Sequence, residues 1–122
     1  MKRIAIACAA LLVVLIGPTH AAGEIGAFRH TVVEKFNADD LALMQARIDQ
    51  ALATEKDGDA LAWKSAKTKA SGSVTPLNRL SWNGMACRRV RITNTYDSLK
   101  GEGVYKFCEK PAGQWKLVGP DV

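Results

Sequence analysis

Residues 83–109 read NGMACRRVRITNTYDSLKGEGVYKFCE, and they set the fold that we expect for the whole chain. Two runs rich in β-branched and aromatic residues predict strands, and turn-forming residues join them at positions 97–101. Cys87 and Cys108 are equally far along the sequence from a point between residues 97 and 98, inside this turn. If the cysteines face each other across one hairpin, this symmetry predicts every other cross-strand pair.

This register divides the side chains of the hairpin between two faces. The first face, which we expect to join the core, carries the pairs Val90–Tyr105 and Arg88–Phe107, together with Ile92. The second face carries both cysteines and is basic. Its other facing pairs are Arg89 with Lys106 and Arg91 with Val104. A bulge between the cysteines would shift the register by one residue and exchange the two faces.

Similar runs continue on both sides of the hairpin. The expected strands are Leu61–Ser65, Gly72–Trp82, Met85–Thr95, Gly103–Glu109 and Gln114–Val118, with a turn at Thr68–Ser71. Asn83-Gly84 is the strongest turn signal, because both residues tolerate the positive φ of a tight hairpin loop. Pro76 cannot donate a ladder hydrogen bond, so its stretch should lie at a sheet edge or carry a bulge.

A helix is expected before the strands, with Asn37 as its N-cap. Asp39 and Asp40 fall in its first turn, where negative charge meets the positive end of the helix dipole. Phe36 and Leu41 occupy the two positions of a hydrophobic staple.

The body of this helix shows an apolar stripe at three- and four-residue steps, formed by Leu41, Met44, Ile48 and Leu52. Gly58 is the expected stop, which gives a helix of about nineteen residues. One helix followed by a meander predicts an α+β fold. We expect the N-terminal helix to pack on a four- to five-stranded antiparallel meander sheet with one disulfide.

The first residues of the chain have the three-part pattern of a secretory signal peptide. Lys2 and Arg3 precede thirteen apolar residues at positions 4–16, and small residues allow cleavage after Ala21. Thirteen residues are too few for a membrane-spanning helix, which needs roughly 20; an uncleaved anchor is the alternative. Cys8 lies too early in the apolar run for the acylated cysteine of a lipoprotein.

We therefore divide the chain into a signal peptide at 1–21, a lead-in segment at 22–36 and a single α+β domain at 37–122. Cleavage leaves two cysteines and one imidazole, His30, and lowers the net charge from +5 to +3. A pair of cysteines in an oxidising compartment predicts a disulfide. The alternative of a metal site lacks four ligands at a zinc spacing, so we expect no metal and no cofactor.

Charge is divided along the chain. Residues 24–59 hold eight acids and four bases, whereas residues 60–122 hold eleven bases and four acids. Within the cluster Arg88, Arg89 and Arg91, the register places Arg89 and Arg91 on one face with Lys106. We interpret these three residues as a candidate site for an anionic partner, such as lipopolysaccharide phosphate, an acidic cell-wall polymer or an acidic protein surface. The alternative is a solvated face that Glu102, Glu109 or the acidic helix neutralises.

The chain lacks the short motifs of the common enzyme classes, including G-x-S-x-G, H-E-x-x-H, C-x-x-C and a phosphate-binding loop. No residue pattern ties His30 to a serine nucleophile. We therefore expect no catalytic residues and no enzyme. Nucleic acid is a poor candidate partner, because the chain is expected to be exported and its basic strands lack interleaved aromatic residues.

Five segments in chain order carry a family resemblance: Asp59–Lys64, Ala70–Pro76, Cys-Arg-Arg at 87–89, Cys108 and Pro111–Val118. This order resembles the C-terminal domain of the bacterial seventeen-kilodalton surface-antigen family over roughly residues 59–118. The resemblance implies an envelope protein without established enzymatic activity, with Cys87 and Cys108 bridged and Gly72, Trp63 and Trp115 as framework residues. The glycine-rich membrane-associated segment and the lipoprotein cysteine of the best-known members are missing.

Together these observations predict an exported, non-enzymatic envelope protein in the periplasm or at the cell surface of a Gram-negative bacterium. Its expected function is to bind or scaffold an anionic envelope component through the basic sheet face. The alternative is an exported inhibitor of a hydrolase such as a lysozyme or protease, because rigid loops lose little entropy on binding.

Overall fold

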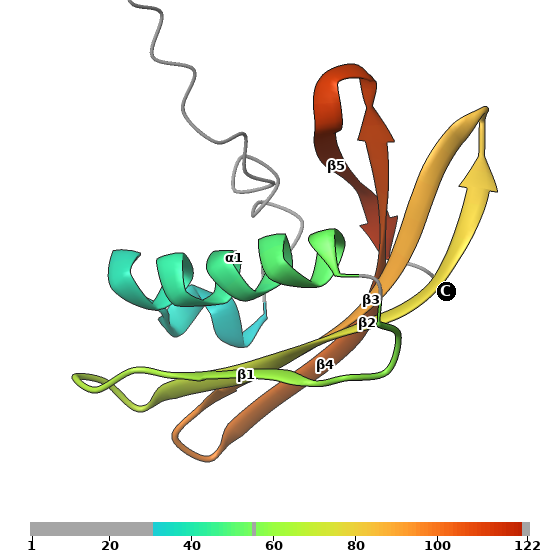
Figure 1. The fold of residues 1–122 in the computed structure, drawn as a ribbon. Helices are drawn as coiled ribbons and strands as arrows, with labels where there is room; N and C mark the ends of the chain where they lie inside the picture. The colour runs from blue at the N-terminus through green and yellow to red at the C-terminus, as the bar shows by residue number, and fades with distance from the viewer. Residues whose placement is uncertain (1–30, 55, 121–122) are drawn as a thin grey trace, which may run out of the picture.

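The computed structural model describes residues 31–54 and 56–120 (Figure 1). Its helical elements are the 3-10 helix η2 (Val32–Lys35), the α-helix α1 (Ala38–Ala53) and the 3-10 helix η3 (Pro111–Gly113). Its strands are β1 (Leu61–Lys64), β2 (Ala70–Trp82), β3 (Met85–Tyr96), β4 (Leu99–Lys110) and β5 (Gln114–Pro120). They form one antiparallel sheet in the order β1-β2-β3-β4-β5, which confirms the expected α+β fold. The predicted signal peptide and His30 lie outside the described residues.

Helix α1 begins as the sequence predicts. The backbone N–H of Asp40 donates to Asn37 Oδ1 at 2.8 Å, and the N–H of Asn37 donates to Asp40 Oδ2 at 3.1 Å. These reciprocal bonds form a capping box. The buried Asp40 carboxylate also accepts from Thr68 Oγ1 at 2.8 Å, so the cap ties the helix to the loop that precedes β2.

The predicted helix stop at Gly58 is wrong. Helix α1 ends at Ala53 with Thr54 as its C-cap, although Gly58 has the positive φ of 87° that glycine favours. The Thr54 carbonyl accepts hydrogen bonds from the side chains of Arg79 and Arg88 on the sheet, which satisfy a helix end without a glycine cap. Gly58 instead donates its N–H to the carbonyl of Pro76, at 2.7 Å.

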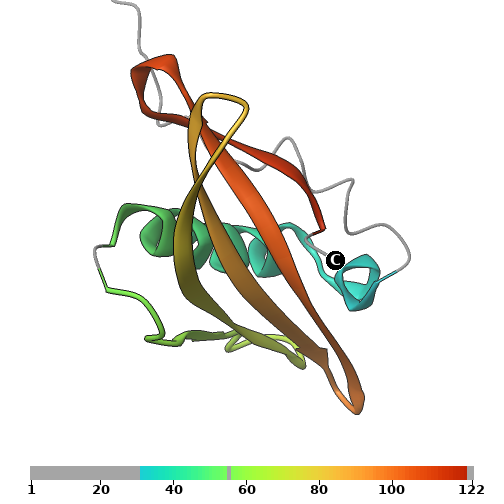
Figure 2. The same cartoon turned by 90° about the vertical axis from the view of Figure 1, so that its right-hand side faces the viewer.

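Helix α1 packs on the concave face of the strongly curved sheet (Figures 1 and 2). Its buried stripe is Met44, Ile48 and Leu52, as predicted, with Leu41 packed partly against the same core. From the end of the lead-in segment, η2 adds Val33 to this core, and Phe36 follows. The ring of Phe36 meets Trp63 edge-on, with centroids 5.3 Å apart, which closes the core over β1.

The register between β3 and β4 is the one predicted from the cysteines, from Cys87↔Cys108 to Tyr96↔Leu99 without a bulge. The turn between them is tighter than predicted, because the strands extend to Tyr96 and Leu99 and leave two residues in the loop. Asp97, the first residue of that loop, has a φ of 55°. Two-residue hairpin loops require such a positive φ.

The remaining connections largely follow the sequence. Asn83 and Gly84 have φ values of 48° and 71°, as a type I′ hairpin requires. The expected irregularity at Pro76 is present, because the pairing of β2 with β3 shifts register between Pro76 and Arg79. This shift lies beyond the part of β2 that pairs with β1. The predicted turn at Thr68–Ser71 ends too late, since β2 begins at Ala70. No helix in the described part of the chain has the length and apolar character to cross a membrane.

Candidate functional site

The face of the sheet turned away from α1, here called the outer face, is the candidate site. Strand alternation places Cys87 and Cys108 on this face and the buried Val90 and Phe107 on the opposite, inner face. The basic residues that β3, β4 and β5 present on the outer face are Arg89, Arg91, Lys100, Lys106, Lys110 and Lys116. Among the described residues of these three strands, Glu102 is the acidic residue on that face. The outer face is therefore strongly basic.

The three predicted anion-binding residues share this face. Arg89 lies opposite Lys106. Arg91 is two residues further along β3, so its side chain is on the same face. Lys106 Nζ lies 4.4 Å from the ring centroid of the part-exposed Trp82, which gives a cation–π contact. This contact holds the ammonium group over the sheet.

Arg91 has an acidic neighbour. Its Nε lies 4.0 Å from the Glu102 carboxylate, and both side chains are about half exposed. Water screens such a pair, so it neutralises the face only weakly. Glu102 also accepts a hydrogen bond from Thr93 Oγ1, at 3.0 Å.

Arg88 belongs to a different environment from Arg89 and Arg91. It is fully buried on the inner face, where it donates to the Thr54 carbonyl at 2.6 Å and to Asp57 Oδ1 at 2.5 Å. A longer contact of 3.4 Å reaches the carbonyl of Lys56. The structure therefore divides the basic run of the sequence into a buried anchor for the α1–β1 loop and a solvent-facing pair.

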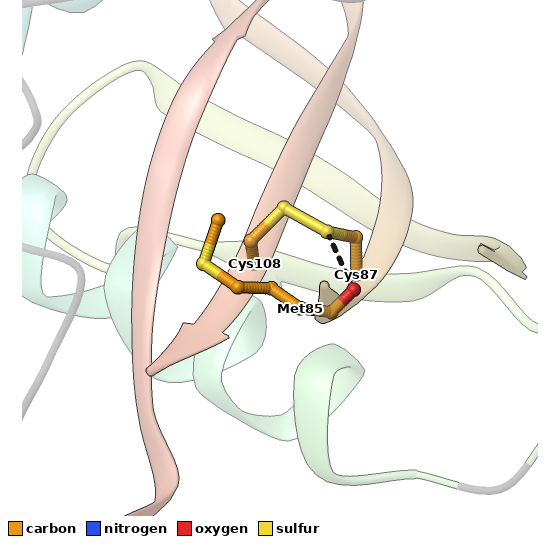
Figure 3. Close-up of a disulfide and its surroundings, with 3 residues drawn as sticks. All are labelled: Met85, Cys87 and Cys108. Carbon is orange, nitrogen blue, oxygen red and sulfur yellow. Dashed lines mark hydrogen bonds between the residues drawn. A yellow bond between two sulfur atoms is a disulfide. The ribbon is translucent and has the colours of Figure 1, made fainter. Parts of the chain in front are cut away.

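The Cys87–Cys108 disulfide is formed, as expected (Figure 3). In the β3–β4 ladder it lies two residues from the Arg89–Lys106 pair on the same face. Its Cα atoms are 4.0 Å apart, and both cysteines are buried. Cys87 Sγ lies 3.6 Å from the carbonyl oxygen of Met85. The bridge connects β3 directly to β4 and so fixes the spacing of Arg89 and Lys106 across the two strands.

Sequence reasoning did not find a hollow of about 440 Å³ between η2 and the β3–β4 hairpin. Its apolar lining includes Val32, Ile92, Leu99 and the ring of Tyr105, whose pKa is raised by burial. Asn94 also lines the hollow and is buried, and its Oδ1 has no hydrogen-bond partner among the described residues. The sequence signal was Gly101, which lines the hollow and leaves one inward position of β4 without a side chain.

The framework residues implied by the family resemblance lie in the packed part of the fold. Trp63 is buried, Trp115 packs partly against the core, and the Trp63 indole covers Gly72. Among the described residues, no group of three or more His, Cys, Asp or Glu side chains could hold a metal ion.

A protein-family model described as 17 kDa outer membrane surface antigen matches residues 50–116. This range spans β1 to β4 and includes both cysteines, Arg88 and the predicted anion-binding residues. No curated protein and no solved structure matches the chain.

Proposed function

Since the chain belongs to the 17 kDa outer membrane surface antigen family, we propose that it is an envelope protein whose outer face binds an anionic envelope component. The observation that carries this proposal is the presence of Arg89, Arg91 and Lys106 on one face of a rigid sheet. The proposal includes export to the periplasm or cell surface and a role without catalysis.

The arrangement of charge supports an anionic ligand. Arg89 lies directly opposite Lys106, and like charges at facing positions of a sheet destabilise each other. Glu102 neutralises Arg91 only weakly, because both side chains of this contact are about half exposed. A ligand with several negative charges would neutralise these cations together, and its binding would depend strongly on ionic strength.

The scaffold favours such binding because it is already ordered. The disulfide and the long β3–β4 pairing fix the backbone from which these cations extend, so a ligand would not have to order it. No feature of the described loops favours the alternative of a hydrolase inhibitor.

Binding to lipopolysaccharide tests the proposal, with dephosphorylated lipopolysaccharide as the ligand control. We expect the protein to bind the phosphorylated form and to lose most of that binding between about 50 and 300 mM salt. Arg89→Glu/Arg91→Glu should lose binding at low salt. The matched control is Lys56→Glu/Lys67→Glu, which makes the same charge change at two exposed loop residues. Equal losses in the two double variants, or binding that does not depend on phosphate, would contradict a specific basic face.

A further inference from the structure

Among the described strands, the first half of β4 has an edge without a partner. Strand β5 pairs with Tyr105–Lys110, and no strand in the described part of the chain pairs with the side of Leu99–Val104 that faces away from β3. The other sheet edges are short or irregular: β1 has four residues, β2 shifts register after Pro76, and β5 shifts register and ends at Pro120. Such features protect edges from pairing. Leu99–Val104 has neither a proline nor a register shift.

The disulfide shows which backbone groups this edge presents. Its Cα–Cα distance of 4.0 Å is close to the about 4.5 Å of a pair that does not exchange backbone hydrogen bonds in an antiparallel ladder. By alternation from Cys108, Leu99, Gly101 and Gly103 bond to β3. The N–H and C=O groups of Lys100, Glu102 and Val104 therefore point away from β3, toward the open edge.

We propose that this edge pairs with the same edge of a second copy of the chain, antiparallel and centred on Gly101. In that register Lys100 lies opposite Glu102 of the second copy, and the two-fold symmetry repeats this pair. Both residues present outward backbone groups, so each pair exchanges its N–H···O=C bonds. A shift of the second copy by two residues in either direction would keep these backbone bonds. One shift would place Lys100 opposite Lys100 of the second copy, and the other would place Glu102 opposite Glu102. Repulsion disfavours both of them, and charge complementarity selects the register centred on Gly101.

The inner face fits the same register. Leu99 is 48% exposed in the single chain and would lie opposite Gly103 of the second copy. The Tyr105 ring lies close to Gly103, 3.0 Å from the position that a Cβ would take there. Leu99 would thus contact the aromatic ring that covers Gly103, diagonally across the new pair.

Antiparallel pairing in one sheet keeps corresponding faces on the same side, so the dimer would join two outer faces into one basic surface. The self-association needs no ligand and therefore does not depend on the function proposed above. The contact is small, and we expect a dissociation constant on the order of 100 µM, weaker than that of interfaces of standard size.

Sedimentation velocity of the purified protein, in the form that the cell produces, tests this proposal without any ligand. The wild type should shift from monomer to dimer between about 10 µM and 1 mM. Lys100→Glu replaces attraction by repulsion in both symmetric pairs and should weaken association at least about tenfold. Lys100→Glu/Glu102→Lys restores opposite charges at the same positions and should return within about threefold of the wild type.

Lys116→Glu is the matched control, because it makes the same charge change on the outer face but lies on β5. Its association should match the wild type, and circular dichroism should show that every variant is folded. The proposal is overturned if the wild type stays monomeric at 1 mM, if Lys100→Glu associates normally, or if the charge swap does not restore the dimer. An equal loss in Lys116→Glu would also overturn it, since the charge effect would then be unspecific.

Discussion

Replacing Arg88 with methionine should destabilise the fold far more than the same change at Arg91, three residues further along β3. Arg88 donates a hydrogen bond to the Thr54 carbonyl and another to the Asp57 carboxylate. Hydrogen bonds to charged groups contribute about 1.5–3 kcal/mol each, so the two bonds represent about 3–6 kcal/mol. Thr54 keeps its bond from Arg79, and the half-exposed Asp57 regains water, so the loss should lie near the lower limit, at about 3 kcal/mol.

Urea unfolding of the oxidised protein measures this loss. With a slope of about 1.5 kcal/mol per molar urea, 3 kcal/mol lowers the midpoint by about 2 M. Arg91→Met removes only a half-exposed ion pair at 4.0 Å and should change the free energy of unfolding by less than about 0.5 kcal/mol. Buried ion pairs can sometimes be replaced by apolar residues without cost. A neutral or stabilising Arg88→Met would place Arg88 among these pairs and refute our expectation that its hydrogen bonds to the α1–β1 loop stabilise the fold.

Three further predictions concern the disulfide, a glycine and a tyrosine. Replacing both bridge cysteines with alanine should lower the free energy of unfolding by about 3 kcal/mol, measured with urea, because the bridge closes a 21-residue separation; an unchanged midpoint would contradict this. Gly72→Ala should cost more than about 2 kcal/mol, because its Cβ would meet the Thr93 carbonyl at 2.5 Å and the Trp63 indole at 2.7 Å. Gly101→Ala meets its nearest neighbour at 3.4 Å and should cost less than half as much in the same assay. Burial raises the pKa of Tyr105, so the folded state holds that proton more tightly than the unfolded state. Stability should therefore fall as the pH rises above about 10, and Tyr105→Phe should reduce this alkaline loss; identical pH profiles would exclude the effect.

Sequence was sufficient for the features that depend on neighbouring residues or on one symmetric constraint. The N-cap at Asn37 and the Asn83-Gly84 turn are local, because side-chain capping and positive φ are settled within a few residues. The β3–β4 register came from two cysteines that had to face each other. Alternation of side chains then placed Arg89 and Lys106 on the outer face without any further information.

Sequence was not sufficient where a distant partner replaced a local signal. Gly58 is a good helix stop by local rules, but Arg79 and Arg88 satisfy the Thr54 carbonyl from more than 20 residues away. The hollow beside Tyr105 likewise depends on η2, whose Val32 packs over Gly101 of β4.

The amino-acid sequence by itself thus determined the α+β class, the disulfide, the hairpin register and the basic character of one sheet face. The tertiary structure decided how the arginines of β3 divide into a buried anchor and a solvent-facing pair. It also decided where α1 ends and which edge has no partner among the described strands. Periodicity and capping are written in adjacent residues, whereas burial, long-range hydrogen bonds and edge pairing depend on which segments the folded chain brings together.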